Sequence, residues 1–241
     1  MRSDTDAQSH VVGVVLLLGL TVVALGGLTA VVGTVVDGHT ATADEARVAN
    51  TFETAFRPVE QTGYQTTRVR FTEGRLTTGE RELRVRNDSG VQRTVPIDAM
   101  IYDSGDNRVR FLGGSVVRGT AGNAWLETDP PVTATRDDTA VIVGAPLVNA
   151  SGGTVSGTGG VSASVRQNVS HQRERLPADN YSVAIETETP RPFSTYFQQV
   201  GATTRVRDID GDGVQSVVAT FPGRPTLYLV RHDMRTEVGH G

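Results

Sequence analysis

The chain contains no cysteine and no lysine, and each absence narrows what the protein can be. Without cysteine there is no disulfide framework, no thiolate zinc site and no cysteine nucleophile. All 23 basic residues are arginines, set against 27 Asp and Glu, and the net charge is −4. The arginines are interspersed with acids, whereas a nucleic-acid-binding surface gathers its basic residues on one face. We therefore expect no nucleic-acid partner.

Enzyme signatures are absent as well. The five histidines are far apart and none lies in an H-E-x-x-H motif, and neither G-x-S-x-G nor G-x-x-x-x-G-K occurs. Carboxylate pairs such as Asp137-Asp138 are typical of a solvated surface. Trp125, the only tryptophan, is either a ligand platform or a core or edge aromatic residue, and the second interpretation is favoured. The sequence predicts a protein that is not an enzyme and has no catalytic residues.

Long apolar runs are also scarce, with one exception. Residues 11–36 contain no charged side chain. As a helix they would extend about 39 Å, more than the roughly 30 Å hydrocarbon core of a bilayer. The segment is too long for the core of a cleavable secretory signal. We therefore expect a single-pass membrane protein, with the larger C-terminal part outside.

Small residues recur within this apolar segment. Gly19, Gly26 and Gly33 are seven residues apart, and Ala30 follows Gly26 at a spacing of four. A stripe of small side chains lets two helix backbones approach closely and pack. Glycine is also common in membrane helices in general. The stripe therefore indicates either helix packing at these four residues or only the usual glycine content of such a helix.

The beginning of the apolar segment carries a more specific pattern, Asp6-Ala7-Gln8-Ser9-His10-Val11-Val12-Gly13-Val14-Val15-Leu16-Leu17-Leu18-Gly19. It resembles the start of the type IV pilin-like surface proteins of haloarchaea. The resemblance implies that residues 1–7 are a leader, which a prepilin-type peptidase removes between Ala7 and Gln8. It further implies that the retained helix packs with other pilin-like subunits, on the cell surface or in a filament.

The segment after the apolar run returns to helical spacing. Val48, Phe52, Phe56 and Val59 recur at intervals of three or four, and Pro58 ends the pattern. We expect residues 8–60 to form the hydrophobic helix and an amphipathic stalk. The apolar stripe of the stalk either contacts other subunits or packs on its own domain, and the second is favoured.

From Tyr64 onward the periodicity changes to two, which indicates strands. The clearest examples are Thr67–Phe71, Glu82–Arg86, Val91–Ile97, Arg108–Phe111, Ala140–Val143, Tyr181–Ile185, Val214–Phe221 and Thr226–Val230. Short helices are expected around Val165–Arg175 and Phe193–Val200. Residues 61–241 are therefore predicted to form a β-rich extracellular domain, with a flexible Gly- and Ser-rich loop at 151–160.

An acidic motif, Asp208-Ile209-Asp210-Gly211-Asp212-Gly213, is the most chemically specific feature of this domain. Alternate carboxylates on a Gly-assisted turn resemble the first half of an EF-hand calcium loop. The glutamate expected at position twelve is replaced by Ala219, and the flanks have the pattern of strands. Asp208, Asp210 and Asp212 thus form either a structural calcium site or a solvated acidic turn.

Four sequons satisfy the N-glycosylation pattern, at Asn87, Asn149, Asn168 and Asn180. An external location would make one or two of them usable.

These observations predict an α+β fold, in which a long N-terminal transmembrane and stalk helix precedes a mainly antiparallel, β-sandwich-like ectodomain. The function expected is a non-enzymatic pilin-like surface subunit. The alternative is a permanently anchored binding module that does not polymerise, an interpretation that the acidic leader favours.

Overall fold

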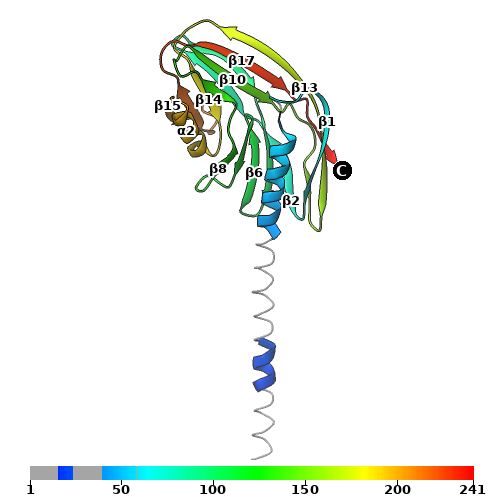
Figure 1. Cartoon of the computed structure of the whole chain (residues 1–241). Coiled ribbons are helices and arrows are strands. Elements are labelled where there is room, and N and C mark those ends of the chain that lie inside the picture. Colours follow the sequence, from blue (N-terminus) through cyan, green and yellow to red (C-terminus); the bar gives the residue numbers. More distant parts are fainter. Residues whose placement is uncertain (1–15, 24–39, 58) are drawn as a thin grey trace, which may run out of the picture. The chain divides into compact units, whose positions relative to one another are not determined.

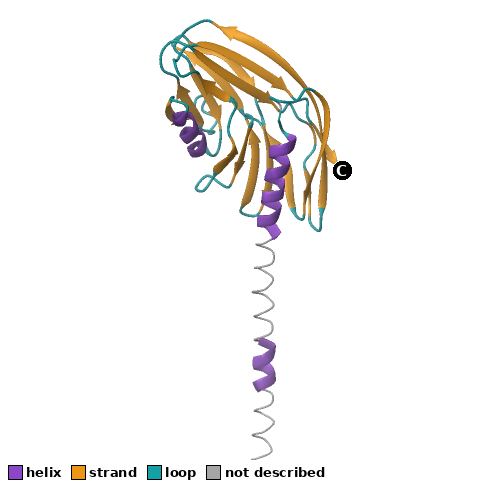
Figure 2. Cartoon of the chain, in the orientation of Figure 1, coloured by secondary structure: helices purple, strands orange, loops and turns teal. Residues whose placement is uncertain are grey.

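The computed structural model describes residues 16–23, 40–57 and 59–241 (Figure 1). The chain divides into an N-terminal unit, Met1–Thr42, and a β-rich unit, Ala43–Gly241. The structure is mostly β-sheet, with 51% of residues in strands and 16% helical (Figure 2). The β-rich unit is a single unit, so the Gly- and Ser-rich residues 151–160 do not separate two subdomains.

The expected fold class and membrane location were wrong at the N-terminus. The described helices are short, at residues 16–23, 40–55 and 190–199. Within the described ranges, none is both long and apolar enough to cross a bilayer. Of these described helices, the one at residues 40–55 includes Asp44, Glu45, Arg47 and Glu53. A long transmembrane and stalk helix, and a single-pass membrane protein with its C-terminal domain outside, are therefore not supported.

The largest sheet has seven strands and contains the longest strand described. In spatial order its main path runs through β11 (Ser151–Gly152), β18 (Glu237–His240), β13 (Val161–Leu176), β17 (Thr226–Asp233), β10 (Ala140–Leu147) and β9 (Val132–Ala134). β1 (Gly63–Phe71) pairs with β13 outside this path. β13 joins β1 and β18 along its first part and β17 along its second, so it links the two ends of the sheet.

Two smaller sheets complete the β-rich unit. The six-stranded sheet consists of β12 (Val155–Gly157), β2 (Gly74–Gly79), β5 (Ala99–Ser104), β6 (Asn107–Leu112), β7 (Ser115–Arg118) and β8 (Trp125–Thr128). The five-stranded sheet consists of β15 (Thr203–Arg207), β16 (Ser216–Thr220), β14 (Ser182–Glu186), β3 (Glu82–Asn87) and β4 (Gly90–Pro96). Most pairings are antiparallel, but β10 pairs with β17 and β11 with β18 in parallel.

The helix of residues 40–55 contributes to the core of the β-rich unit, alongside β6 and β2 (Figure 1). Val48, Phe52 and Phe56 are 0–4% exposed and belong to a hydrophobic cluster with residues of β1, β2, β5, β6, β7, β13 and β18. Phe56 lies 5.0 Å from Phe111 of β6 between ring centroids. The prediction that this stripe packs on its own domain is therefore confirmed, although Val59 is 52% exposed.

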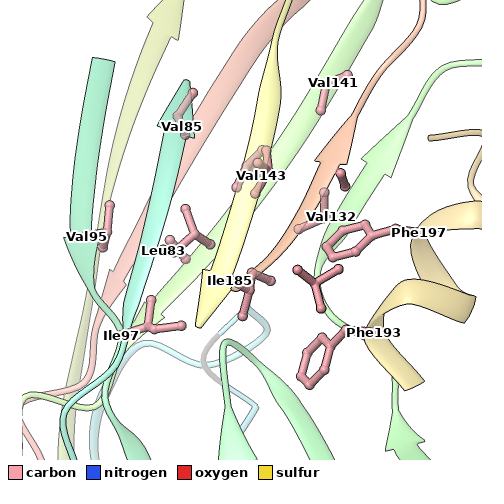
Figure 3. Packing of buried hydrophobic residues seen from close by; sticks show 14 of the residues in the cluster. Leu83, Val85, Val95, Ile97, Val132, Val141, Val143, Ile185, Phe193 and Phe197 are labelled. Carbon is pink, nitrogen blue, oxygen red and sulfur yellow. The ribbon is translucent and has the colours of Figure 1, made fainter. Parts of the chain in front are cut away.

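A second hydrophobic cluster is covered by helix α2 (Pro190–Gln199). Figure 3 shows Phe193 and Phe197 of α2 directed toward Ile185 of β14 and Val132 of β9. The Tyr196 hydroxyl donates a hydrogen bond of 2.8 Å to the Val132 carbonyl. The helix predicted around Phe193–Val200 is confirmed.

The strands predicted from period-two alternation are also present, in β1, β3, β4, β6, β10, β14, β16 and β17. The helix expected at Val165–Arg175 was wrong, because these residues belong to the 16-residue strand β13. The segment 151–160 contributes β11 and β12, short strands at the ends of two sheets.

Candidate functional site

The acidic loop between β15 and β16 brings together the three predicted ligands. Ligand oxygens of Asp208, Asp210 and Asp212 all lie within 4.8 Å of one another. Asp208 accepts backbone hydrogen bonds from Gly211 at 2.8 Å and from Gly213 at 3.0 Å, one at each carboxylate oxygen. Gly211 and Gly213 adopt φ values of 81° and 88°, which favour glycine. The loop is thus closed by its own carboxylates.

A buried arginine joins this loop to the five-stranded sheet. Arg84 of β3 forms ion pairs with Glu186 of β14, with Asp210 at 2.6 Å and with Glu82 at 2.6 Å. Glu186 is 4% exposed and also accepts the backbone N–H of Glu82 at 2.8 Å. Burial raises the pKa of the Glu186 carboxyl, and Arg84 opposes that rise.

The Arg84 cluster bears on whether the loop holds calcium. Glu82, Glu186 and Asp210 also have ligand oxygens within 4.8 Å of one another, but the Arg84 guanidinium contacts all three. Asp210 is therefore already paired with a cation, and position twelve of the expected loop is Ala219 of β16. With Asp210 paired to Arg84, the carboxylates of Asp208 and Asp212 remain for a cation, and Ca²⁺ prefers six to eight oxygens. This donor set fits the solvated acidic turn better than a calcium site.

We expect Asp208→Ala to lower the free energy of unfolding by about 1 kcal/mol, because it leaves two backbone N–H groups without their carboxylate acceptor. Asp208→Asn, which keeps one side-chain oxygen, should cost less. Both variants are measured by urea unfolding in EDTA and in calcium. A stabilisation of the natural protein by calcium that Asp208→Ala abolishes would instead assign calcium to the loop.

A second ion-pair cluster surrounds Glu188, in the segment between β14 and α2. Its carboxylate pairs with Arg81 at 2.7 Å, with Arg108 at 3.2 Å and with Arg110 at 3.1 Å. Arg110 is 3% exposed, and this burial lowers the pKa of its guanidinium. The cluster therefore ties the start of α2 to β6 of the six-stranded sheet.

Trp125 lies on β8, the last strand of the six-stranded sheet, so it is an edge aromatic residue. It is 43% exposed and lines a cavity of about 360 Å³ with Asp129, Arg191 and Tyr196. The Arg118 guanidinium lies 5.1 Å from the ring centroid, and the indole N–H donates to Glu127 at 3.1 Å. Arg118 also pairs with Glu45 of the 40–55 helix at 3.4 Å, so the indole is held by fixed neighbours.

The four sequon asparagines differ in accessibility. Asn149 and Asn180 are exposed, whereas Asn87 and Asn168 are partly buried. The Asn87 amide donates to Asp179 at 2.7 Å, and the Asn180 amide donates to Asp88 at 2.6 Å. These reciprocal hydrogen bonds join the β3–β4 turn to the loop before β14. The amides of Asn87 and Asn180 are thus engaged within the fold.

The N-terminal predictions fall mostly outside the described residues. Ala7 and Gln8, the expected cleavage site, and Gly26, Ala30 and Gly33 of the small-residue stripe all lie there. Gly19 is described and helical, and a Cβ added to it would meet nothing within 4 Å. The large apolar side chains in residues 16–23 are 62–72% exposed.

Sequence reasoning missed Arg84 and Glu186 as partners of the acidic loop. Arg84 lies between Leu83 and Val85, which face the hydrophobic core, so its side chain lies on the opposite face of β3, where it is 6% exposed. Because Arg84 follows the ordinary alternation of Glu82–Arg86, the sequence carried no signal that its charge is buried; only the structure shows its carboxylate partners.

Comparison with known protein families assigns the chain to one of them. Residues 7–237 match a model described as a family of unknown function, DUF7289. No curated protein and no solved structure matches the chain. Because the family model covers nearly the whole sequence, the chain belongs to the DUF7289 family.

Proposed function

We propose that this member of the DUF7289 family is a non-enzymatic, pilin-like structural subunit that assembles with like subunits through its N-terminal apolar segment. In this proposal a prepilin-type peptidase removes residues 1–7, and the β-rich unit is the part displayed by the assembly. The resemblance of residues 6–19 to pilin-like precursors supports the processing step. The exposed apolar helix at residues 16–23 carries the assembly step.

That helix has an unusual surface for a single chain. Leu16, Leu17, Leu18, Leu20, Val22 and Val23 are each more than 60% exposed. Isolated apolar side chains are normal on surfaces, but a contiguous apolar patch marks an interaction site. A partner surface is therefore needed to remove these side chains from water.

The polar groups of the same helix are compatible with apolar surroundings. Thr21 donates its hydroxyl to the carbonyl oxygens of Leu17 and Leu18, at 2.9 Å and 2.8 Å. A threonine paired within its own helix leaves no side-chain donor unsatisfied when another helix covers it. This segment can therefore pack on all sides.

The connection to the displayed part also suits a subunit. Asp44, 1% exposed, accepts the Thr72 backbone N–H at 2.5 Å, and Phe52 and Phe56 lie in the hydrophobic cluster. The residues that follow the N-terminal unit are thus built into the β-rich unit. An assembly formed through the apolar segment would carry this folded unit as part of the same chain.

We expect the protein purified from cells that make it naturally to begin at Gln8 and to form assemblies that resist mild detergent. Gly19→Leu should disrupt these assemblies, because within the described residues a Cβ at this position meets nothing within 4 Å, and a larger side chain would press on a neighbouring subunit. Intact mass, N-terminal sequencing and light scattering in detergent measure these outcomes.

The matched control is Gly122→Leu, which also has open space within 4 Å but lies in the β-rich unit. It should assemble like the natural protein. A chain that begins at Met1 and stays monomeric would contradict the proposal, and would favour the binding module that does not polymerise. Assembly unchanged in Gly19→Leu would exclude close helix packing at this residue.

A further inference from the structure

Two of the five histidines, far apart in the sequence, meet across the seven-stranded sheet. His171 of β13 and His232 of β17 are direct register partners in an antiparallel pairing. Their Nδ1 atoms are 2.8 Å apart, and their ring centroids are 5.0 Å apart. Because direct partners in a strand pair present their side chains on the same face, both rings are held there by the sheet itself.

A third residue orients the His171 ring. The Thr62 hydroxyl, just before β1, lies 2.8 Å from Nε2 of His171. When Nε2 carries its proton and donates it to Thr62, Nδ1 of His171 presents a lone pair. His232 then donates its Nδ1 proton to that lone pair. In the neutral pair a single hydrogen bond joins the two Nδ1 atoms, and both of these nitrogens are good metal ligands.

The surroundings limit solvent on one side of the pair. His232 is 4% exposed, and His171 is partly buried. Val169, two residues before His171 on β13, and Met234, directly after the end of β17, are 1% and 0% exposed and belong to the hydrophobic cluster. Arg173, two residues beyond His171, is exposed. An apolar wall on one side and access from the other are typical surroundings for a bound metal ion.

We propose that His171 and His232 form a binding site for a divalent transition-metal ion, with Zn²⁺ as the representative. The ion takes the place of the hydrogen bond between the two Nδ1 atoms, and the single ring proton of His232 moves from Nδ1 to Nε2, so both rings stay neutral. Imidazole nitrogens favour Zn²⁺, Cu²⁺ and Ni²⁺ over Ca²⁺ and Mg²⁺. The two nitrogens must separate slightly, since each Zn–N bond is about 2.0–2.1 Å long.

The site is open, because the two histidines supply only part of a coordination shell. The described groups of three or more converging His, Cys, Asp or Glu ligands are the two acidic clusters near Asp210, and neither includes a histidine. Water therefore completes the shell, and the ion is exchangeable, unlike one in a closed structural zinc site. A bound ion would also cross-link β13 to β17.

Zinc titration of the EDTA-treated full-length protein, followed by calorimetry, tests the proposal. We expect one equivalent of zinc to bind, and His171→Asn to abolish this binding. Thr62→Val, which removes the group that orients His171, should weaken binding about tenfold. His240→Asn, at an exposed histidine on β18, is the matched control and should bind like the natural protein.

A spectroscopic readout separates ligation from a structural role. Electron paramagnetic resonance of the Cu²⁺-loaded protein should show coupling to two imidazole nitrogens, reduced to one in His171→Asn. If the pair is only a hydrogen bond of the fold, His171→Asn will lower the melting temperature and leave zinc uptake unchanged, which overturns the proposal. Zinc uptake that disappears in Asp208→Asn instead would assign the metal to the acidic loop and would also overturn it.

Discussion

Replacing Arg84 by methionine is expected to lower the free energy of unfolding by about 3 kcal/mol, because it removes the cation that Glu82, Glu186 and Asp210 share. Glu186 is buried and would be left without its ion-pair partner. Without Arg84 the three carboxylates repel one another. Glu82 and Asp210 are 40% and 43% exposed, so water screens part of this repulsion, and the loss of unfolding free energy stays at the lower end of the range for buried ion pairs. Urea unfolding at neutral pH measures the loss.

The loss should shrink on acidification, and the sign follows from Glu186. Burial raises the pKa of this carboxyl in the folded state, so the folded state binds its proton more readily than the unfolded chain does. Binding of that proton stabilises the folded state fully when the pH is below the pKa of glutamate in the unfolded chain, about 4.3. This stabilisation is lost as the pH rises through the higher pKa that Glu186 has in the folded state. Arg84→Met should therefore approach the natural protein in stability as the pH falls toward 4.3.

Two further variants test whether the lost charge of Arg84 causes the destabilisation. Glu186→Gln should lower the free energy of unfolding less than Arg84→Met does, because Arg84 keeps Glu82 and Asp210 as partners. Arg93→Met breaks the exposed pair with Glu174 and should change stability little. An Arg84→Met loss that is independent of pH would show that packing of the arginine stem, not charge, stabilises this region.

Phe52→Ala is expected to lower the free energy of unfolding by about 3–5 kcal/mol, because it leaves a cavity where a fully buried ring packs. Phe52 is 0% exposed, and its ring centroid lies 5.0 Å from that of Phe56. The loss should appear as a lower urea midpoint for the whole β-rich unit, since the cluster around Phe52 includes residues of two sheets.

Thr54→Ala, two residues away on the exposed side of the same helix, is the control. Alanine favours helix, and the lost hydroxyl bond to the Asn50 carbonyl is local, so we expect little change. A small effect of Phe52→Ala would mean that the helix is dispensable for the stability of the β-rich unit.

The sequence by itself determined the strands, helices and loop that depend on the pattern of residues within one short segment. Alternation of apolar and polar residues predicted β3, β16 and β17, because side chains of a strand point to opposite faces in turn. Apolar spacing of three and four predicted the helix that carries Val48, Phe52 and Phe56, and also α2. The spacing of Asp208, Asp210 and Asp212 likewise predicted that their carboxylates converge.

Ambiguous periodicity explains the error at β13. Val165, Val169 and Leu176 are spaced by four and seven, which suits a helix as well as a strand. The extended state is stabilised by hydrogen-bonded pairing with β1, β17 and β18, which lie elsewhere in the sequence. Non-local pairing of this kind overrides local preference. The membrane-spanning expectation rested on composition alone, and within the described residues no helix meets it.

Only the tertiary structure decided which charged and titratable side chains meet. Arg84 lies 102 residues from Glu186 and 126 from Asp210, and His171 lies 61 residues from His232. The sequence shows Arg84 in the ordinary alternation of a strand, and alternation fixes the face of each side chain without fixing the neighbouring strands. Strand order and register bring these residues together, since they are set by the packing of whole sheets and not by any short segment.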